Sequence, residues 1–143
     1  MPRFLDTNIL LRYLTRDDPE KAEACLALLL RVERGEEVVV TSDLVIAEVV
    51  FTLQSPRQYG LSRDQVRQLV EPIVSLRSLR LPNKGLYSRA FELYCQLNIS
   101  FTDAYNTALM ENRGIREIYS YDADFDRVVG LTRVIPDSPP EGD

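Results

Sequence analysis

The chain has 143 residues, 45% of them apolar and 27% charged, with a formal net charge of −5 and no histidine. Such a chain is long enough for one globular domain with its own core, and its composition excludes a disordered protein. The missing histidine excludes Ser-His-Asp and Cys-His nucleophilic sites and zinc sites built on imidazole. Any chemistry therefore depends on carboxylates, hydroxyls, amides and arginines.

Strand-like and helix-like patterns alternate along the whole chain. We predict strands at residues 3–5, 37–41, 79–81, 115–121 and 133–135. We predict helices at residues 9–14, 19–33, 43–54, 63–75, 86–97 and from 103 to near 114. N-terminal caps are expected in the run Asp17-Asp18-Pro19 and at Ser42, Ser62 and Thr102. This alternation predicts an α/β fold with a mainly parallel, five-stranded sheet flanked by helices.

We expect a single domain over residues 1–136, followed by a flexible tail at 137–143. No apolar run approaches the ~20 residues needed to cross a bilayer, and the N-terminus lacks the apolar core of a signal peptide. We therefore expect a cytoplasmic protein that does not bind membranes. Cys25 and Cys95 fall in helix-like stretches, so we expect reduced thiols in the core.

Two acids follow predicted strands, where ligands gather in parallel sheets. Asp6 ends the first strand, although an aspartate there also suits a helix N-cap. Thr7 and Asn8 could bind a carboxylate or only shape the turn. Asp122 follows the fourth strand. The positions of Asp6 and Asp122 therefore indicate a site at one edge of the sheet.

Two further acids lie in predicted helices. Glu48 stands in LVIAEVVFTL, which is so apolar that we expect a buried helix. A lone carboxylate there needs a partner, either an arginine or a shared site. Asp103 lies in the first turn of FTDAYNTALM, where the helix dipole alone would favour an acid. Asn106 is one turn on, on the same face.

The stretch SYDADFDRV sets Asp122, Asp124 and Asp126 on alternate positions. This pattern fits a solvated turn, a calcium loop or one wall of a metal site. An EF-hand loop starting at Asp122 needs glycine at its sixth position and glutamate at its twelfth, where this chain has Arg127 and Arg133. The calcium-loop alternative is therefore excluded.

Carboxylates that converge within ~4 Å repel one another by a few kcal/mol per pair, a cost that a cation between them offsets. Because the available ligands are the hard oxygen atoms of carboxylates, we expect the bound cation to be Mg²⁺ or Mn²⁺. If Asp6, Glu48, Asp103, Asp122 and Asp124 are set aside, the remaining acids equal the 17 basic residues. The acidic net charge therefore does not exclude a polyanionic substrate.

Four motifs in order, FLDTNILL, IAEVVFTL, FTDAYNTALM and IYSYDADFDRV, resemble the PIN domain. The resemblance is to toxin ribonucleases of the VapC type from bacterial and archaeal toxin–antitoxin pairs. It implies a parallel sheet of about five strands and a metal-dependent endoribonuclease that hydrolyses RNA phosphodiester bonds. It also implies a cognate antitoxin protein and a homodimer as partners.

Carried over by motif, the resemblance assigns the site residues. The catalytic acids would be Asp6, Glu48, Asp103 and Asp122, and the metal ligands Asp6, Asp103, Asp122 and Asp124. Supporting polar residues would be Thr7, Asn8 and Ser120, to which the helical spacing adds Asn106. Candidate RNA contacts are Arg12, Arg127 and Arg133, each with a surface salt bridge as the alternative. Asp126 lies outside the transferred pattern, and we expect it to be solvated.

Two other functions stay open on the sequence alone. One is a housekeeping PIN nuclease that acts in RNA processing or on DNA without an antitoxin. The other is a non-catalytic interaction module that a metal ion stabilises. The second would gain thermal stability from Mn²⁺ and leave RNA intact.

Overall fold

The computed structural model describes residues 1–137 and confirms the predicted α/β class. The predicted tail at 137–143 lies, apart from Asp137, outside the described residues. Within them, no helix combines the length and the apolar character that a membrane span requires. The elements in chain order are β1 (Arg3–Phe4), α1 (Thr7–Thr15), α2 (Pro19–Glu33), β2 (Val39–Val40), α3 (Asp43–Gln54), α4 (Arg63–Val74), β3 (Leu79–Arg80), η1 (Lys84–Leu86), α5 (Tyr87–Leu97), α6 (Phe101–Asn112), β4 (Glu117–Tyr119), η2 (Ala123–Arg127) and β5 (Thr132–Val134).

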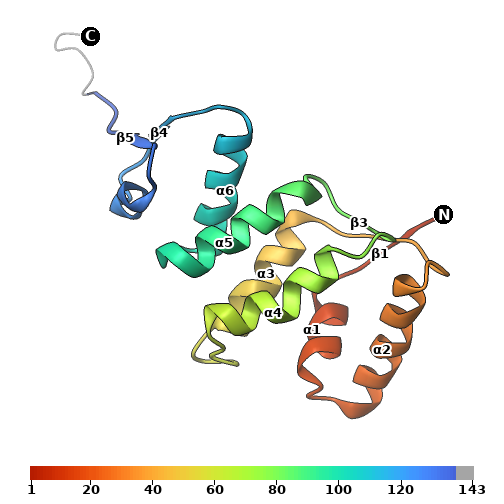
Figure 1. Ribbon diagram of the computed structural model, residues 1–143. Helices are drawn as coiled ribbons and strands as arrows, with labels where there is room; N and C mark the ends of the chain where they lie inside the picture. Colours follow the sequence, from red (N-terminus) through yellow and green to blue (C-terminus); the bar gives the residue numbers. More distant parts are fainter. Residues whose placement is uncertain (138–143) are drawn as a thin grey trace, which may run out of the picture.

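The five strands pair in parallel, as predicted, but they form two sheets where we expected one. β1, β2 and β3 pair in that order, with Phe4 opposite Val40. β4 pairs with β5, with Ile118 opposite Arg133. Figure 1 shows the two sheets on opposite sides of the helices α3, α4 and α5. Within residues 1–137, β1 and β4 therefore each keep an unpaired edge.

Local signals in the sequence set the helix starts. Asp18, Ser42 and Ser62 cap α2, α3 and α4 as predicted, and Ser62 does so through a reciprocal capping box. The start of α6 differs from the prediction. Ser100 is its N-cap, because its hydroxyl accepts a backbone hydrogen bond from the first turn at 3.0 Å. Thr102 is an exposed residue inside that turn.

One continuous core joins the helices α1 to α6. Its centre is a cluster of tilted and edge-packed rings from Tyr87, Phe91, Tyr94 and Phe101. Arg63 of α4 donates to the carbonyl of Tyr94 at 2.9 Å. Asp43 of α3 accepts hydrogen bonds from the hydroxyls of Tyr87 and, at 2.8 Å, Tyr105. The pair α5–α6 is therefore anchored to both α3 and α4.

Replacing Asp43 by alanine is expected to lower the free energy of unfolding by about 1–3 kcal/mol, because the buried Tyr87 hydroxyl would lose its acceptor. The matched control is Asp17→Ala, which removes a carboxylate from the exposed Tyr59 hydroxyl and should cost no more than about 0.5 kcal/mol. Urea unfolding followed by circular dichroism measures both. Equal losses in the two variants would contradict the role given to Asp43.

The prediction that α3 is a fully buried helix is wrong. Its core side packs through Val45, Ile46, Val49, Val50 and Leu53. On the other side, Leu44 is 82% and Phe51 72% exposed, and Glu48 between them is also exposed. An all-apolar sequence favours burial all round, but within residues 1–137 no other element covers the second face.

Candidate metal centre

The first group of acids lies where β1 ends and α1 begins. Asp6 occupies the N-cap position of α1, but its side chain makes no capping hydrogen bond. The buried Thr7 donates its hydroxyl to the carboxylate of Glu48 at 3.0 Å. Glu48 forms no ion pair within residues 1–137. Neither the capping role of Asp6 nor the salt bridge of Glu48 therefore explains these acids. We call Asp6, Thr7 and Glu48 the β1 group.

The second group joins α6 to the loop after β4, and we call Asp103, Asp122 and Asp124 the β4 group. One carboxylate oxygen of each residue lies within 4.8 Å of the others. The backbone N–H of Asp122 donates to the Ser120 hydroxyl at 3.0 Å, and that of Asp124 donates to the Asp122 carboxylate at 2.9 Å. These two hydrogen bonds curl the loop into η2 and hold its acids next to Asp103.

The charges of the β4 group act on one another. Burial raises the pKa of the Asp103 carboxyl above its ordinary value, and the charges of Asp122 and Asp124 raise it further, while a hydrogen bond with Ser100 lowers it. Because the folded state holds this proton more tightly than the unfolded chain, the stability that Asp103 contributes is present at low pH. It is lost as the pH rises through the raised pKa. At neutral pH the repulsion among the three carboxylates therefore lowers the stability of the folded protein unless a cation binds.

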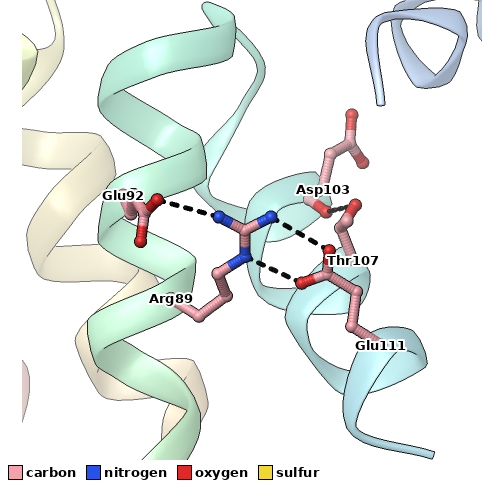
Figure 2. A network of polar contacts seen from close by, with 5 residues as sticks. All are labelled: Arg89, Glu92, Asp103, Thr107 and Glu111. Carbon is pink, nitrogen blue, oxygen red and sulfur yellow. Dashed lines mark hydrogen bonds and ion pairs between the residues drawn. The ribbon is translucent and has the colours of Figure 1, made fainter. Parts of the chain in front are cut away.

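The guanidinium of Arg89 does not neutralise Asp103. Arg89 of α5 donates to Glu111 at 2.8 and 3.0 Å and to Glu92 at 2.9 Å. Figure 2 shows the Asp103 carboxylate pointing away from this network. Thr107 donates to the backbone carbonyl of Asp103, at 2.8 Å, and not to its carboxylate. The Asp103 carboxylate is therefore free to bind a cation.

The candidate RNA-binding arginines differ in what they contact. Arg133 donates to both carboxylate oxygens of Asp126, at 3.0 and 3.2 Å, and this bond lowers the pKa of Asp126. Asp126 is exposed, in agreement with the expected solvation, and it is also paired with Arg133. Arg127 lies 3.5 Å from Asp124 and donates to a carbonyl in the α5–α6 turn at 2.9 Å. Arg12 forms no ion pair in the part of the chain that the structure describes.

The remaining predicted residues divide into two kinds. Thr7 and Ser120 each position an acid through a hydrogen bond. Asn8 and Asn106 are exposed, and the structure gives neither a contact with the acids. Sequence reasoning missed Ser100, which caps the turn that carries Asp103. The pattern S-x-x-D at 100–103 was the available signal for that cap.

The structure brings the three acids of the β4 group together and bonds Glu48 to Thr7, the residue after Asp6, but it places the two groups after different strands. Asp103 lies with Asp122 and Asp124, whereas Asp6 and Glu48 are not among the acids that converge within 4.8 Å. The two groups follow β1 and β4, which belong to different sheets. That all these acids meet in a single pocket stays a prediction.

A family model described as the PIN domain matches residues 3–131. This chain belongs to the PIN-domain family. The match includes every acid of the β1 and β4 groups. PIN-domain proteins are nucleases that use divalent metal ions, and the carboxylate donors of the β4 group fit a hard divalent cation.

Other comparisons add little to the family match. One similar solved structure is the crystal structure of VapC20 from Mycobacterium tuberculosis, which is described as a toxin that cleaves the sarcin–ricin loop. It shares 22% sequence identity with this PIN domain, covers 94% of this chain and 99% of that chain, and has a TM-score of 0.39. Among curated proteins, none matches this chain.

Proposed function

We propose that this PIN-domain protein is a metal-dependent endoribonuclease that hydrolyses RNA phosphodiester bonds in the cytoplasm. The observation that carries the proposal is the β4 group, in which three carboxylates lie within 4.8 Å of one another. Arg89 does not bind the Asp103 carboxylate, and Arg127 pairs only with Asp124, at 3.5 Å, so Asp103 and Asp122 have no ion-pair partner within residues 1–137. Such an arrangement is costly unless a cation binds there.

Asp103, Asp122 and Asp124 would hold a single Mg²⁺ or Mn²⁺ ion, with Asp6 as a further ligand. A bound ion of this kind polarises the phosphoryl oxygens and lowers the pKa of water. Glu48, oriented by the Thr7 hydroxyl, would accept a proton from the attacking water. The resemblance to VapC-type nucleases implies 5′-phosphate and 3′-hydroxyl products. Arg12, which has no internal ion pair in the described chain, is our choice for a contact with the RNA backbone.

We propose further that the protein is the toxin of a toxin–antitoxin pair, neutralised by a cognate antitoxin protein, and that it forms a homodimer. The support is the family match over residues 3–131 together with the four VapC-like motifs in order. Expression of the parent is then expected to arrest growth, and co-expression of the antitoxin should relieve that arrest.

Cleavage of a mixed RNA pool tests the enzymatic proposal. The parent should cut RNA with Mg²⁺ or Mn²⁺ and should stop when a chelator is added. Asp6→Ala should fold normally by circular dichroism and fail to cut, because the free carboxylate at the end of β1 is lost. If Asp6→Ala cuts as fast as the parent, or if the chelator has no effect, the proposed mechanism is wrong.

A further inference from the structure

Apart from tyrosines and a cysteine, the buried polar side chains of residues 1–137 are three threonines. They are Thr7, Thr41 and Thr107, and each is at most 6% exposed. The Thr7 hydroxyl donates to the Glu48 carboxylate, and the Thr107 hydroxyl donates to the backbone carbonyl of Asp103 (Figure 2). Two of the three buried hydroxyls therefore bind a site acid, through its carboxylate or its backbone. The third, that of Thr41, lies directly after β2 and binds no acid itself.

The hydroxyl of Thr41 replaces a hydrogen bond that the sheet lacks. The N–H of Leu5 donates to the carbonyl of Val40 at 2.8 Å, as a parallel ladder requires. The next ladder bond would join the carbonyl of Leu5 to the N–H of Ser42. Ser42 instead turns into α3 as its N-cap, and within residues 1–137 no backbone N–H donates to the Leu5 carbonyl. The Thr41 hydroxyl supplies the donor at 3.0 Å.

Water cannot take over this hydrogen bond, because Leu5 is 3% and Thr41 is 2% exposed. A buried carbonyl without a donor is costly, so the peptide group that carries it would turn toward another partner. That peptide group is the one that joins Leu5 to Asp6. Because a peptide bond is planar, fixing its carbonyl also fixes the nitrogen of Asp6 and the direction in which the chain leaves β1.

The backbone of Asp6 is held on its other side as well. Its own carbonyl accepts a hydrogen bond from the N–H of Ile9 in α1 at 3.2 Å. Its side chain makes no capping hydrogen bond, although it occupies the N-cap position of that helix. The main chain of Asp6 is therefore fixed on both sides while its carboxylate stays available. This is the arrangement expected of a ligand that is positioned before the cation binds.

We propose that Thr41 is a positioning residue of the metal centre, whose hydroxyl fixes the peptide between Leu5 and Asp6 and so directs the Asp6 carboxylate toward the cation. Thr41 itself touches neither the cation nor the RNA, because its side chain is buried. This role deepens the proposed function and rests on it, since it takes Asp6 as a ligand. Groups that orient a metal ligand from outside contribute about 10–100-fold to metal affinity or activity.

Thr41→Val tests this role, because valine has nearly the shape of threonine and lacks the hydroxyl. With Mn²⁺ as the probe, electron paramagnetic resonance of the free ion should show an affinity about 10–100-fold below that of the parent. The kcat for RNA cleavage should fall while the KM for RNA stays unchanged, because Thr41 does not touch the substrate. Thr41→Ser keeps the hydroxyl and should restore both the affinity and the kcat.

The matched control is Thr15→Val. Thr15 is the last residue of α1, and its hydroxyl donates to the carbonyl of Leu11 at 2.8 Å, a local bond within the helix. This variant loses the same chemical group at the end of α1 opposite Asp6. Its Mn²⁺ affinity and kcat should therefore equal those of the parent. An equal loss in Thr15→Val and Thr41→Val would overturn the positioning role.

Loss of the buried hydrogen bond also lowers the melting temperature of Thr41→Val. The measurements are therefore made well below that temperature, on protein that circular dichroism shows to be folded. If Thr41→Val does not fold, Thr41→Ala and Thr41→Ser are compared, since both lack the methyl group and differ only in the hydroxyl. Parental Mn²⁺ affinity and kcat in a folded variant without the hydroxyl would show that Thr41 only stabilises the sheet, and the positioning role would be refuted.

Metal binding and RNA cleavage together separate this role from the proposed function. A parent that binds Mn²⁺ but cuts no RNA refutes the nuclease, and weaker Mn²⁺ binding by Thr41→Val still supports the positioning role. A parent that cuts RNA with Mn²⁺, together with a Thr41→Val variant that matches it in both measurements, supports the nuclease and refutes the positioning role.

Discussion

The variant Asp122→Asn is expected to cleave RNA more than about 100-fold more slowly than the parent, because even residues that only orient a metal ligand contribute 10–100-fold. Asp122 belongs to the β4 group, and its carboxylate also accepts the hydrogen bond that starts η2. An amide keeps that acceptor oxygen and the shape of the side chain, so the loop should persist. What the variant loses is the negative charge beside Asp103.

The matched control for this variant lies four residues further along the same loop. Asp126 is exposed and bound to Arg133 outside the β4 group. Asp126→Asn should therefore leave the cleavage rate within about twofold of the parent. Initial rates at saturating Mg²⁺ or Mn²⁺ compare the variants. Equal losses at Asp122 and Asp126 would show that the loop matters for its conformation, and the metal-binding role of Asp122 would be refuted.

Binding of Mn²⁺ or Mg²⁺ is expected to raise the melting temperature of the parent, since a ligand at 100 times its dissociation constant adds about 2.7 kcal/mol to the stability of the folded state. For a domain of this size each kcal/mol corresponds to roughly 2–4 °C. The gain should weaken as the pH falls through the raised pKa of Asp103, because the protonated carboxyl binds a cation poorly. Thermal unfolding with and without a chelator, at several pH values, measures the effect.

Asp103→Asn separates repulsion from metal binding in the same experiment. Without metal, this variant should be more stable than the parent at neutral pH, because it removes one of three mutually repelling charges. With metal, it should gain little or nothing. A variant that gains as much as the parent would place the cation elsewhere.

The helix caps near the candidate site show which structural features a local sequence pattern can predict. The caps at Asp18, Ser42 and Ser62 were predictable because an N-cap depends on a side chain and a backbone N–H only three residues apart. The same reasoning placed the cap of α6 at Thr102, although Ser100 fills that position. Ser100 and Thr102 both offer a hydroxyl, and the pattern S-x-x-D at 100–103 is the local signal that favours Ser100.

The surroundings of Glu48 could not be predicted from its neighbours in the sequence. Its apolar neighbours predicted a buried helix, yet α3 exposes the face that carries Leu44, Glu48 and Phe51. The apolar character of a helix face indicates that the face favours burial, but it does not indicate which element of the fold covers it. The hydrogen bond from Thr7, which holds Glu48 at the start of α1, joins residues far apart in the chain and follows from the fold alone.

The sequence by itself determined the family of this protein and the α/β class, and it is the source of our proposal for the acids that would carry its chemistry, because motifs, caps and residue types are properties of short stretches. Only the tertiary structure decided that the strands fall into two sheets, that Asp103 lies with Asp122 and Asp124, and that β1 and β4 keep open edges. Strand pairing depends on how the helices between the strands pack, here through contacts of Asp43, Arg63 and the aromatic cluster. Those contacts join residues that are distant in sequence, so no short stretch encodes which strand β1 will meet.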